Sequence, residues 1–234
     1  MVTEKLDILA FGAHPDDVEI GMGATIFKHA QAGLAVGICD LTRAELSSNG
    51  DTETRAAEAE EAARLLGVKV RVNLGLPDRG LHPGDDATAR ITAEIRRHRP
   101  RFVFAPYFRD RHPDHVQCSR LVEEAVFNAK LRRYLPDLPP VKVERLYFYY
   151  INDPDEPSAV VDVTEVYPVK LKALAAYRSQ FSPPREGSAD VATPLNQGYI
   201  ERVEARDRLT GRFLSCAYGE GFYSRLPERI DLFR

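Results

Sequence analysis

The 234-residue chain has few cysteines, and their number is odd. Cys39, Cys118 and Cys216 form no CxxC pair. An odd count without paired spacing argues against a disulfide framework, and a free cysteine is more often a small buried residue than a metal ligand. This usage is typical of a reducing compartment, so we expect a cytoplasmic protein.

Long apolar runs and an excess of positive charge are also missing. No stretch approaches the ~18 apolar residues of a membrane-spanning helix. The first apolar run is too short for a signal peptide and ends at Asp16 and Asp17. The formal net charge is -3, which indicates no basic surface for nucleic acid or anionic lipid. We therefore expect neither a membrane nor a nucleic-acid partner.

Short apolar runs alternate with helical periodicity over the first half of the chain. The runs predict strands at 6–11, 34–40 and 102–105, and alternation predicts another at 68–74. The periodic segments predict helices at 21–31, 55–66, 87–98 and 118–129. Strands that alternate with helices of about 10–15 residues indicate βαβ units. We therefore predict an α/β fold with a Rossmann-like, mostly parallel sheet flanked by helices. A chain of this length can share one core, so we expect a single domain over residues 1–234.

The pattern changes after Leu131 and predicts a C-terminal extension. Strands are expected at 145–151 and 159–163, and helices at 164–181 and 199–213. Between the two helices, residues 182–197 are rich in Pro, Gly and Ser and predict a long loop. Loops of this length in a compact domain are often lids or binding loops.

Two strand-to-helix turns carry the polar chemistry of the sequence. Residues 14–17 read His-Pro-Asp-Asp after the first predicted strand, and residues 112–115 read His-Pro-Asp-His after the fourth. In the usual doubly wound strand order, 3-2-1-4-5, the first and fourth strands are neighbours. Ligands bind at the carboxyl ends of the strands at that point. We therefore expect one site built from both turns.

His14, Asp17 and His115 are the candidate metal ligands. Two neutral imidazoles and a carboxylate suit Zn²⁺ or Fe²⁺ and leave coordination positions open for water. Asp16 beside them is a candidate general base. His112, when protonated, could stabilise an oxyanion and donate a proton to a leaving amine.

Each of these residues also has a structural interpretation. His14 can simply pack while Asp17 favours a helix N-terminus, which is worth about 0.3–1 kcal/mol. Asp16 can be an N-cap, and His112 can be a structural histidine. Asp114 is placed either to orient a catalytic or ligating imidazole or to cap the following helix. Two such turns at adjacent strand ends favour the functional interpretation.

Three functions fit this site. The first is a metal-dependent amide hydrolase, the second an iron centre for oxygen chemistry, and the third a metal-binding or sugar-binding protein without catalytic activity. A base at Asp16 and an acid at His112 favour hydrolysis. A dinucleotide site is not indicated, because Gly12, Gly21 and Gly23 form no GxGxxG in the right place.

The two turns and their surroundings resemble the PIG-L/LmbE-like N-acetylglucosamine deacetylase family, and within it the bacillithiol-biosynthesis deacetylases. The similarity extends over nearly the whole chain. The motifs that carry it lie at residues 12–23, 39–42, 45–50, 76–80, 110–115, 177–181 and 194–199.

The resemblance implies a Rossmann-like zinc enzyme that removes acetate from N-acetylglucosaminyl malate. The alternative is a deacetylase or amidase that acts on another N-acetylglucosamine conjugate or on a thiol conjugate. In the family pattern the Zn²⁺ ligands match His14, Asp17 and His115, the general base matches Asp16, and the charge-stabilising imidazole matches His112. Related members form hexamers, so the resemblance also implies a homo-oligomer.

The substrate side chains are expected to include arginines. Arg55 and Tyr199 match family positions that face the substrate. Arg109 and Arg111 lie just before the second turn, and the planar guanidinium of arginine can meet a carboxylate of the malyl group with two parallel hydrogen bonds. We count Asp114 with Asp16 and His112 among the candidate catalytic residues.

Overall fold

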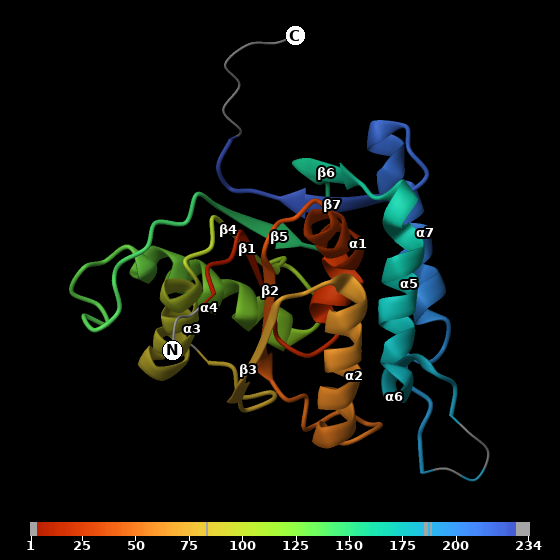
Figure 1. Cartoon of the computed structure of the whole chain (residues 1–234). Coiled ribbons are helices and arrows are strands. Elements are labelled where there is room, and N and C mark those ends of the chain that lie inside the picture. Colours follow the sequence, from red (N-terminus) through yellow and green to blue (C-terminus); the bar gives the residue numbers. More distant parts are fainter. Residues whose placement is uncertain (1–3, 83, 185–186, 188, 228–234) are drawn as a thin grey trace.

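The computed structural model describes residues 4–82, 84–184, 187 and 189–227. Within these residues the strands form a seven-stranded sheet in the order β3-β2-β1-β4-β5-β7-β6 (Figure 1). The parallel strands are β1 (Ile8–Gly12), β2 (Val36–Thr42), β3 (Val70–Leu76), β4 (Phe102–Pro106) and β5 (Arg145–Tyr149). The antiparallel strands are β6 (Ala159–Asp162) and β7 (Gly219–Tyr223).

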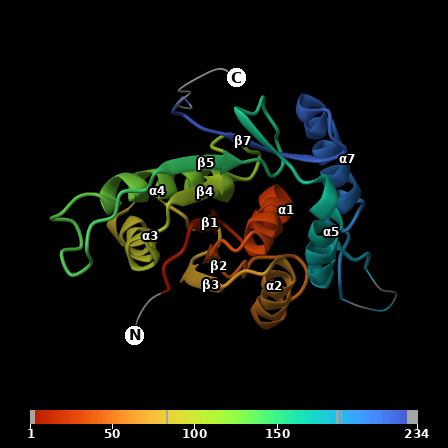
Figure 2. The same ribbon diagram turned by 45° about the horizontal axis from the view of Figure 1, so that its top comes forward.

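Helices cover both faces of the sheet (Figure 2). One face carries α3 (Asp85–His98) and α4 (Pro113–Ala129). The other carries α1 (Asp17–Gln31), α2 (Thr52–Leu66), α5 (Tyr167–Ala176) and α7 (Tyr199–Gly211). Short elements complete the described chain, namely α6 (Arg178–Phe181) and the 3-10 helices η1 (Thr164–Val166) and η2 (Arg212–Leu214).

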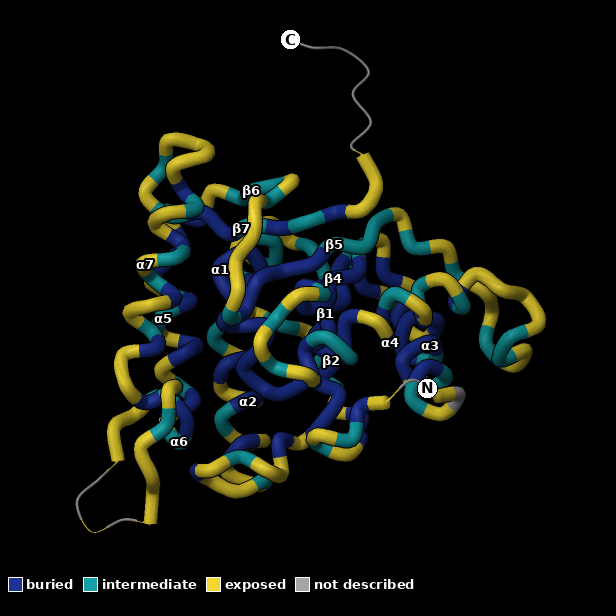
Figure 3. Tube along the Cα trace, turned by 180° about the vertical axis from the view of Figure 1, so that it is seen from behind, coloured by how far each residue is buried: buried dark blue, intermediate teal, exposed yellow. Residues whose placement is uncertain are grey.

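The central strands are buried on both sides because helices cover both faces. In β1, Leu9 and Phe11 pack toward α3 and α4, while Ile8 and Ala10 pack toward α1 and α2. Successive side chains of a strand point to opposite faces, so a strand covered on both faces is apolar throughout. Figure 3 shows the buried central strands beside the more exposed surfaces of α5 and α7. The predicted α/β fold and the order 3-2-1-4-5 are confirmed.

Helix α1 is broken at Met22, whose backbone is not helical (φ -149°, ψ 23°). The break frees two backbone N–H groups, and the Glu220 carboxylate accepts both, from Ala24 at 3.1 Å and from Thr25 at 2.6 Å. An anion at the N-terminus of a helical segment satisfies its free donors. The C-terminal extension therefore caps the second half of α1.

A buried ion network surrounds this cap. Lys170 is fully buried, and its ammonium lies 2.6 Å from Glu220 and 2.7 Å from Asp207. Arg206 contacts Asp207 at 2.9 Å and donates a hydrogen bond to the Ile20 carbonyl, at the end of the first half of α1. The network thus joins α5, α7 and β7 to both halves of α1.

Several boundaries differ from the sequence predictions. Helix α4 begins at Pro113 instead of residue 118, because the His112 ring accepts the Asp114 N–H and proline suits the first helical turn. The helix expected over 164–181 is divided at Tyr177, where ψ is 64°. Strand β7 was not predicted. The single-domain expectation for residues 1–234 stays a prediction. None of the helices in the described part of the chain has the length and apolar character that crossing a bilayer demands.

Candidate active site

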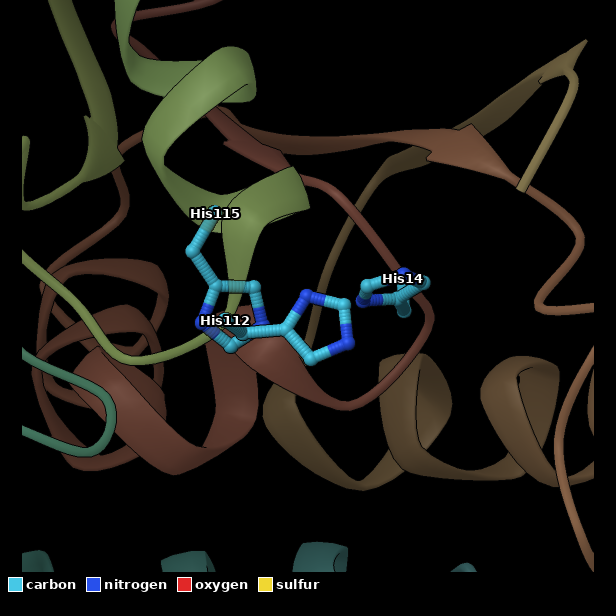
Figure 4. A group of neighbouring side chains, drawn as sticks. All are labelled: His14, His112 and His115. Carbon is cyan, nitrogen blue, oxygen red and sulfur yellow. The ribbon is translucent and has the colours of Figure 1, made fainter. Parts of the chain in front are cut away.

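The turns after β1 and β4 lie side by side, because these strands are adjacent and parallel. With the loops after β2 and β3 they line a cavity of about 450 Å³. His14 comes from the first turn, and His112 and His115 project from the start of α4 (Figure 4). Their ring centroids lie 4.6 to 5.6 Å apart. The expected single site is therefore present as one cluster.

Asp17 lies between the two imidazoles with which it was grouped. One carboxylate oxygen is 3.1 Å from His115 Nε2, and the other is 3.5 Å from His14 Nδ1. Two other trios among the described residues have ligand atoms that all lie within 4.8 Å of one another, and these trios are His14, His112 and His115, and His14, Asp78 and Asp114. The predicted trio is instead linked pairwise through the two oxygens of Asp17.

The far nitrogens of both candidate ligand imidazoles meet carboxylates. His14 Nε2 lies 3.3 Å from Asp78 and 3.6 Å from Asp114, and His115 Nδ1 lies 3.0 Å from Asp110. Histidines that bind metals almost always donate their other ring N–H to such a partner. Buried nitrogen and oxygen donors with these outer carboxylates fit a divalent metal such as Zn²⁺.

Charges within the cluster shift the pKa values of its members. Burial opposes ionisation of Asp17, but the neighbouring His115 and His14 hold the pKa of Asp17 well below its usual range. Burial also disfavours protonated His115, yet Asp17 and Asp110 together raise the pKa of His115 to about 9. A metal at this site would therefore displace a proton from His115.

Asp16 adopts a strained backbone conformation, with φ at 111°. Its carboxylate accepts a hydrogen bond from Arg55 Nη2 at 2.9 Å, and Arg55 Nε donates to the Pro15 carbonyl. Burial raises the pKa of Asp16 to about 7, although the charge of Arg55 opposes this shift. Asp16 occupies the N-cap position of α1, but its side chain makes no capping hydrogen bond.

His112 and Asp114 occupy the start of α4. The His112 ring Nδ1 accepts the Asp114 N–H at 3.2 Å, which leaves Nε2 to carry the proton of the neutral ring. Burial lowers the pKa of His112, and the charges of His115 and His14 act in the same direction. The Asp114 carboxylate is buried against His14 and accepts both the backbone N–H and the guanidinium of Arg79.

The four expected substrate residues are not all at the cavity. Arg55, Arg111 and Tyr199 line it. The guanidinium of Arg109 instead pairs with the Asp155 carboxylate, and Arg109 is not among the lining residues. The structure therefore gives no support for Arg109 in substrate binding.

Three polar residues of the cluster were not predicted as site residues. Asp78 lies in the turn after β3, and Asp110 lies two residues before His112. Asn152 follows β5 and binds Asp110 through both its backbone N–H and its side chain. The available signal for Asp78 was its position just after β3, the strand that lies beside β2. Asp110 lies in the motif at 110–115, which was its signal, whereas Asn152 offered none because only the fold brings it to the cluster.

Known proteins are similar to this chain in sequence and in fold. The PIG-L family, described as GlcNAc-PI de-N-acetylase, matches residues 9–126. The crystal structure of the conserved protein TT1542 from Thermus thermophilus has a TM-score of 0.87 and 40% sequence identity, covering 98% of this chain and 99% of that one. The diacetylchitobiose deacetylase of Thermococcus kodakarensis is 32% identical over 191 residues, covering 74% of this chain and 70% of that protein.

A further relative comes from Bacillus cereus. The probable N-acetyl-alpha-D-glucosaminyl L-malate deacetylase 2 of that organism is 29% identical over 186 residues, covering 74% of this chain and 83% of the relative. The family match spans half of the chain, and these relatives align over most of it. The chain therefore belongs to the PIG-L family of GlcNAc-PI de-N-acetylases.

Proposed function

We propose that the protein is a metal-dependent hydrolase that removes acetate from an N-acetylglucosamine conjugate. The observation that carries this proposal is the arrangement at the cavity floor. Asp17 lies between His14 and His115, and Asp16 lies beside them against Arg55. The family contains enzymes that act on the amide bond of acetylated amino sugars.

We propose Zn²⁺ as the metal, held by His14, Asp17 and His115. When bound, zinc supplies Lewis-acid polarisation of the acetyl carbonyl and lowers the pKa of a bound water toward ~7. The outer carboxylates Asp78 and Asp110 keep the two imidazoles in the orientation that such a metal requires.

Asp16 takes the proton from the attacking water. Its carboxylate is buried and is held by Arg55, so it faces the cavity without free rotation. A base whose pKa lies near neutral pH is suited to this transfer. The same carboxyl group can then pass the proton to the leaving nitrogen, which completes hydrolysis to acetate and a free amine.

His112 stabilises the charge that develops on the acetyl oxygen. Its Nδ1 is occupied by the Asp114 backbone N–H, so the neutral ring presents Nε2–H as a hydrogen-bond donor. A fixed donor at a developing oxyanion can contribute several kcal/mol. This geometry favours a neutral His112 as the donor rather than a protonated one.

The substrate we propose is N-acetylglucosaminyl malate, an intermediate of bacillithiol biosynthesis. Arg111 supports this choice, because it lies exposed at the cavity and its guanidinium makes no hydrogen bond or ion pair with the described residues. The Bacillus cereus relative carries the same activity in its name. The alternative is another N-acetylglucosamine conjugate or a thiol conjugate, and the Thermococcus relative favours diacetylchitobiose.

Acetate release tests the proposal. The purified protein is assayed with N-acetylglucosaminyl malate, diacetylchitobiose and free N-acetylglucosamine, before and after chelation and with zinc or iron restored under nitrogen. We expect release from the malyl conjugate that stops with chelator and returns with zinc. Activity that needs oxygen would favour iron chemistry, and zinc binding without acetate release would favour a binding protein. The expected homo-oligomer and cytoplasmic location stay predictions.

A further inference from the structure

Asp110 lies in the loop after β4 and is tied to both histidines of the second turn. Its Oδ1 is 3.0 Å from the ring nitrogen Nδ1 of His115. The same oxygen accepts the backbone N–H of His112 at 2.8 Å. Because an ionised carboxylate only accepts hydrogen bonds, this contact places a proton on His115 Nδ1. The proton that a metal would displace is therefore the one on Nε2, the nitrogen beside Asp17.

Two residues from later in the chain hold Asp110 in place. Asn152 donates its backbone N–H at 3.0 Å and its side-chain N–H at 2.9 Å to the Asp110 carboxylate. The side-chain oxygen of Asn152 accepts the hydroxyl of Tyr199 at 3.0 Å. Each of these hydrogen bonds is donated in the direction of Asp110. Together they form a continuous series from Tyr199, the first residue of α7, to His115.

We propose that Asp110 is a positioning residue for His115 in metal binding, and that Asn152 and Tyr199 hold Asp110 for this purpose. The inference rests on the proposed role of His115 as a metal ligand. It means that the C-terminal extension contributes to metal affinity, although none of the proposed ligands lies in it. It also gives Tyr199 a second task besides lining the cavity.

A purely structural role would have a different signature. Asp110 ties the loop after β4 to the loop after β5, so its loss could lower the stability of the metal-free protein. A structural residue would leave the metal dissociation constant unchanged once the protein is folded. A positioning residue weakens metal binding even when the melting temperature of the metal-free protein is unchanged.

The experiment measures the Zn²⁺ dissociation constant by competition with a chromophoric chelator, and the melting temperature of each metal-free protein. The variants are Asp110→Asn, Asn152→Ala and Tyr199→Phe. We expect Asp110→Asn to raise the dissociation constant about 10–100-fold. Tyr199→Phe removes one hydroxyl and should raise it about two- to fivefold. Asp155→Asn in the neighbouring loop is the matched control and should leave it unchanged.

The outcomes separate this inference from the proposed function. If His115→Ala binds zinc as the native protein does, the proposed ligand set is wrong. If His115→Ala loses zinc while Asp110→Asn and Tyr199→Phe keep the native dissociation constant, the ligand set stands and the positioning role is overturned. Should Asp110→Asn fail to fold, Tyr199→Phe decides the question, because it removes only one hydroxyl, whose hydrogen bond goes to the Asn152 side chain.

Discussion

Among single residues, Arg55 shows how burial changes the role of a charged side chain. Its position in the family pattern suggests a substrate contact, and it lines the cavity. However, its guanidinium is buried, with Nη2 on Asp16 and Nε on the Pro15 carbonyl. Its Nη1 is buried and has no hydrogen-bond partner among the described residues. We therefore propose that Arg55 chiefly holds the carboxylate of Asp16 and that contact with the substrate is its second role.

Asp16→Asn tests the role of the base. The amide cannot take a proton from water, and general base catalysis typically contributes about 10²–10⁴-fold. We expect kcat to fall by that factor while zinc stays bound, as measured by steady-state kinetics and elemental analysis. His14→Ala is the contrasting variant, because it should lose zinc and activity together. An Asp16→Asn protein with near-native kcat would refute the assignment.

Arg111 and Arg55 should differ in their effect on substrate choice. Arg111→Ala should lower kcat/KM for the malyl conjugate about 10–100-fold, because one charged hydrogen bond is worth about 1.5–3 kcal/mol. It should change kcat/KM for free N-acetylglucosamine far less. Arg55→Ala should lower both values together, since it releases Asp16. Arg109→Ala is the control and should alter neither; equal losses for Arg111→Ala on both substrates would contradict a carboxylate contact.

Helix α3 shows how one element organises a loop through a single buried charge. Arg96 is 2% exposed and has no carboxylate partner among the described residues. Its guanidinium instead donates to backbone carbonyls at the end of α4 and in the following loop, those of Asn128, Ala129, Leu131, Tyr134, Leu135 and Leu138. The loop over 130–138 is therefore held without regular structure of its own.

Replacement of Arg96 should be costly. Arg96→Met keeps the aliphatic bulk but leaves several carbonyls without a donor, and each charged hydrogen bond is worth about 1.5–3 kcal/mol. We expect the free energy of unfolding to fall by about 3 kcal/mol or more in urea denaturation. Arg97→Met, next to it on the exposed side, should cost less than about 1 kcal/mol. Similar losses for the two variants would show that the carbonyl contacts are unimportant.

The end of α3 should give stability a pH dependence. The bond to Glu94 raises the pKa of His98 above 6.5, and His98 and Arg97 hold the pKa of Glu94 below 4.5 despite burial. The contribution of His98 to the free energy of unfolding is complete below pH 6.5 and is lost as the pH rises through the pKa of His98 in the folded protein. The Glu94 contribution is complete above pH 4.5 and is lost as pH falls. The Tm of the native protein should therefore exceed that of His98→Gln by the largest amount between pH 4.5 and pH 6.5. A constant difference from pH 4 to 9 would contradict this prediction.

The parallel half of the fold could be predicted because β1, β2 and β4 are buried on both faces and read as short apolar runs, while the partly exposed strand β3 alternates. β7 could not, since Gly219, Glu220 and Gly221 give it no apolar pattern. Glu220 is buried there because its carboxylate pairs with Lys170 and accepts an N–H group freed by the break in α1. Both partners lie far from Glu220 in the sequence. The approach of the Tyr149 ring to Gly21, where a Cβ would lie 2.0 Å from the ring, is equally invisible in sequence.

The site could be predicted as far as its two turns, because both follow recognisable strands. Asp78 and Asn152 could not be assigned, since their partners lie far away in the sequence. Asp110 has its two histidine partners nearby, but its bonds to them depend on the shape of the turn. Arg109 was expected at the cavity on position alone, and its pairing with Asp155 could not be anticipated.

For the whole molecule, the buried network around Lys170 joins the parallel sheet to the C-terminal extension. Glu220 caps α1, and Asp207 accepts hydrogen bonds from Lys170 and Tyr167. Two carboxylates and a fully buried ammonium are stable only as a set, because each charge compensates the cost of burying the others.

Lys170→Met should therefore destabilise the protein strongly. The two carboxylates would remain buried without their shared cation, and breaking a buried ion pair costs about 3–5 kcal/mol. We expect this loss in the free energy of unfolding from urea denaturation at neutral pH. Lys172→Met, two residues away and exposed, is the matched control and should be close to native. Two variants of equal stability would mean that the network contributes nothing.

The break in α1 has a consequence for amide hydrogen exchange. In an unbroken helix, the N–H groups of Ala24 and Thr25 would be protected by carbonyls of the preceding turn, and their exchange would report the fraying of that helix. Here a carboxylate on β7 protects them instead. Their deuterium uptake therefore reports whether β7 is packed against α1. Two amides near the start of the chain thus report the docking of a strand from its C-terminal part.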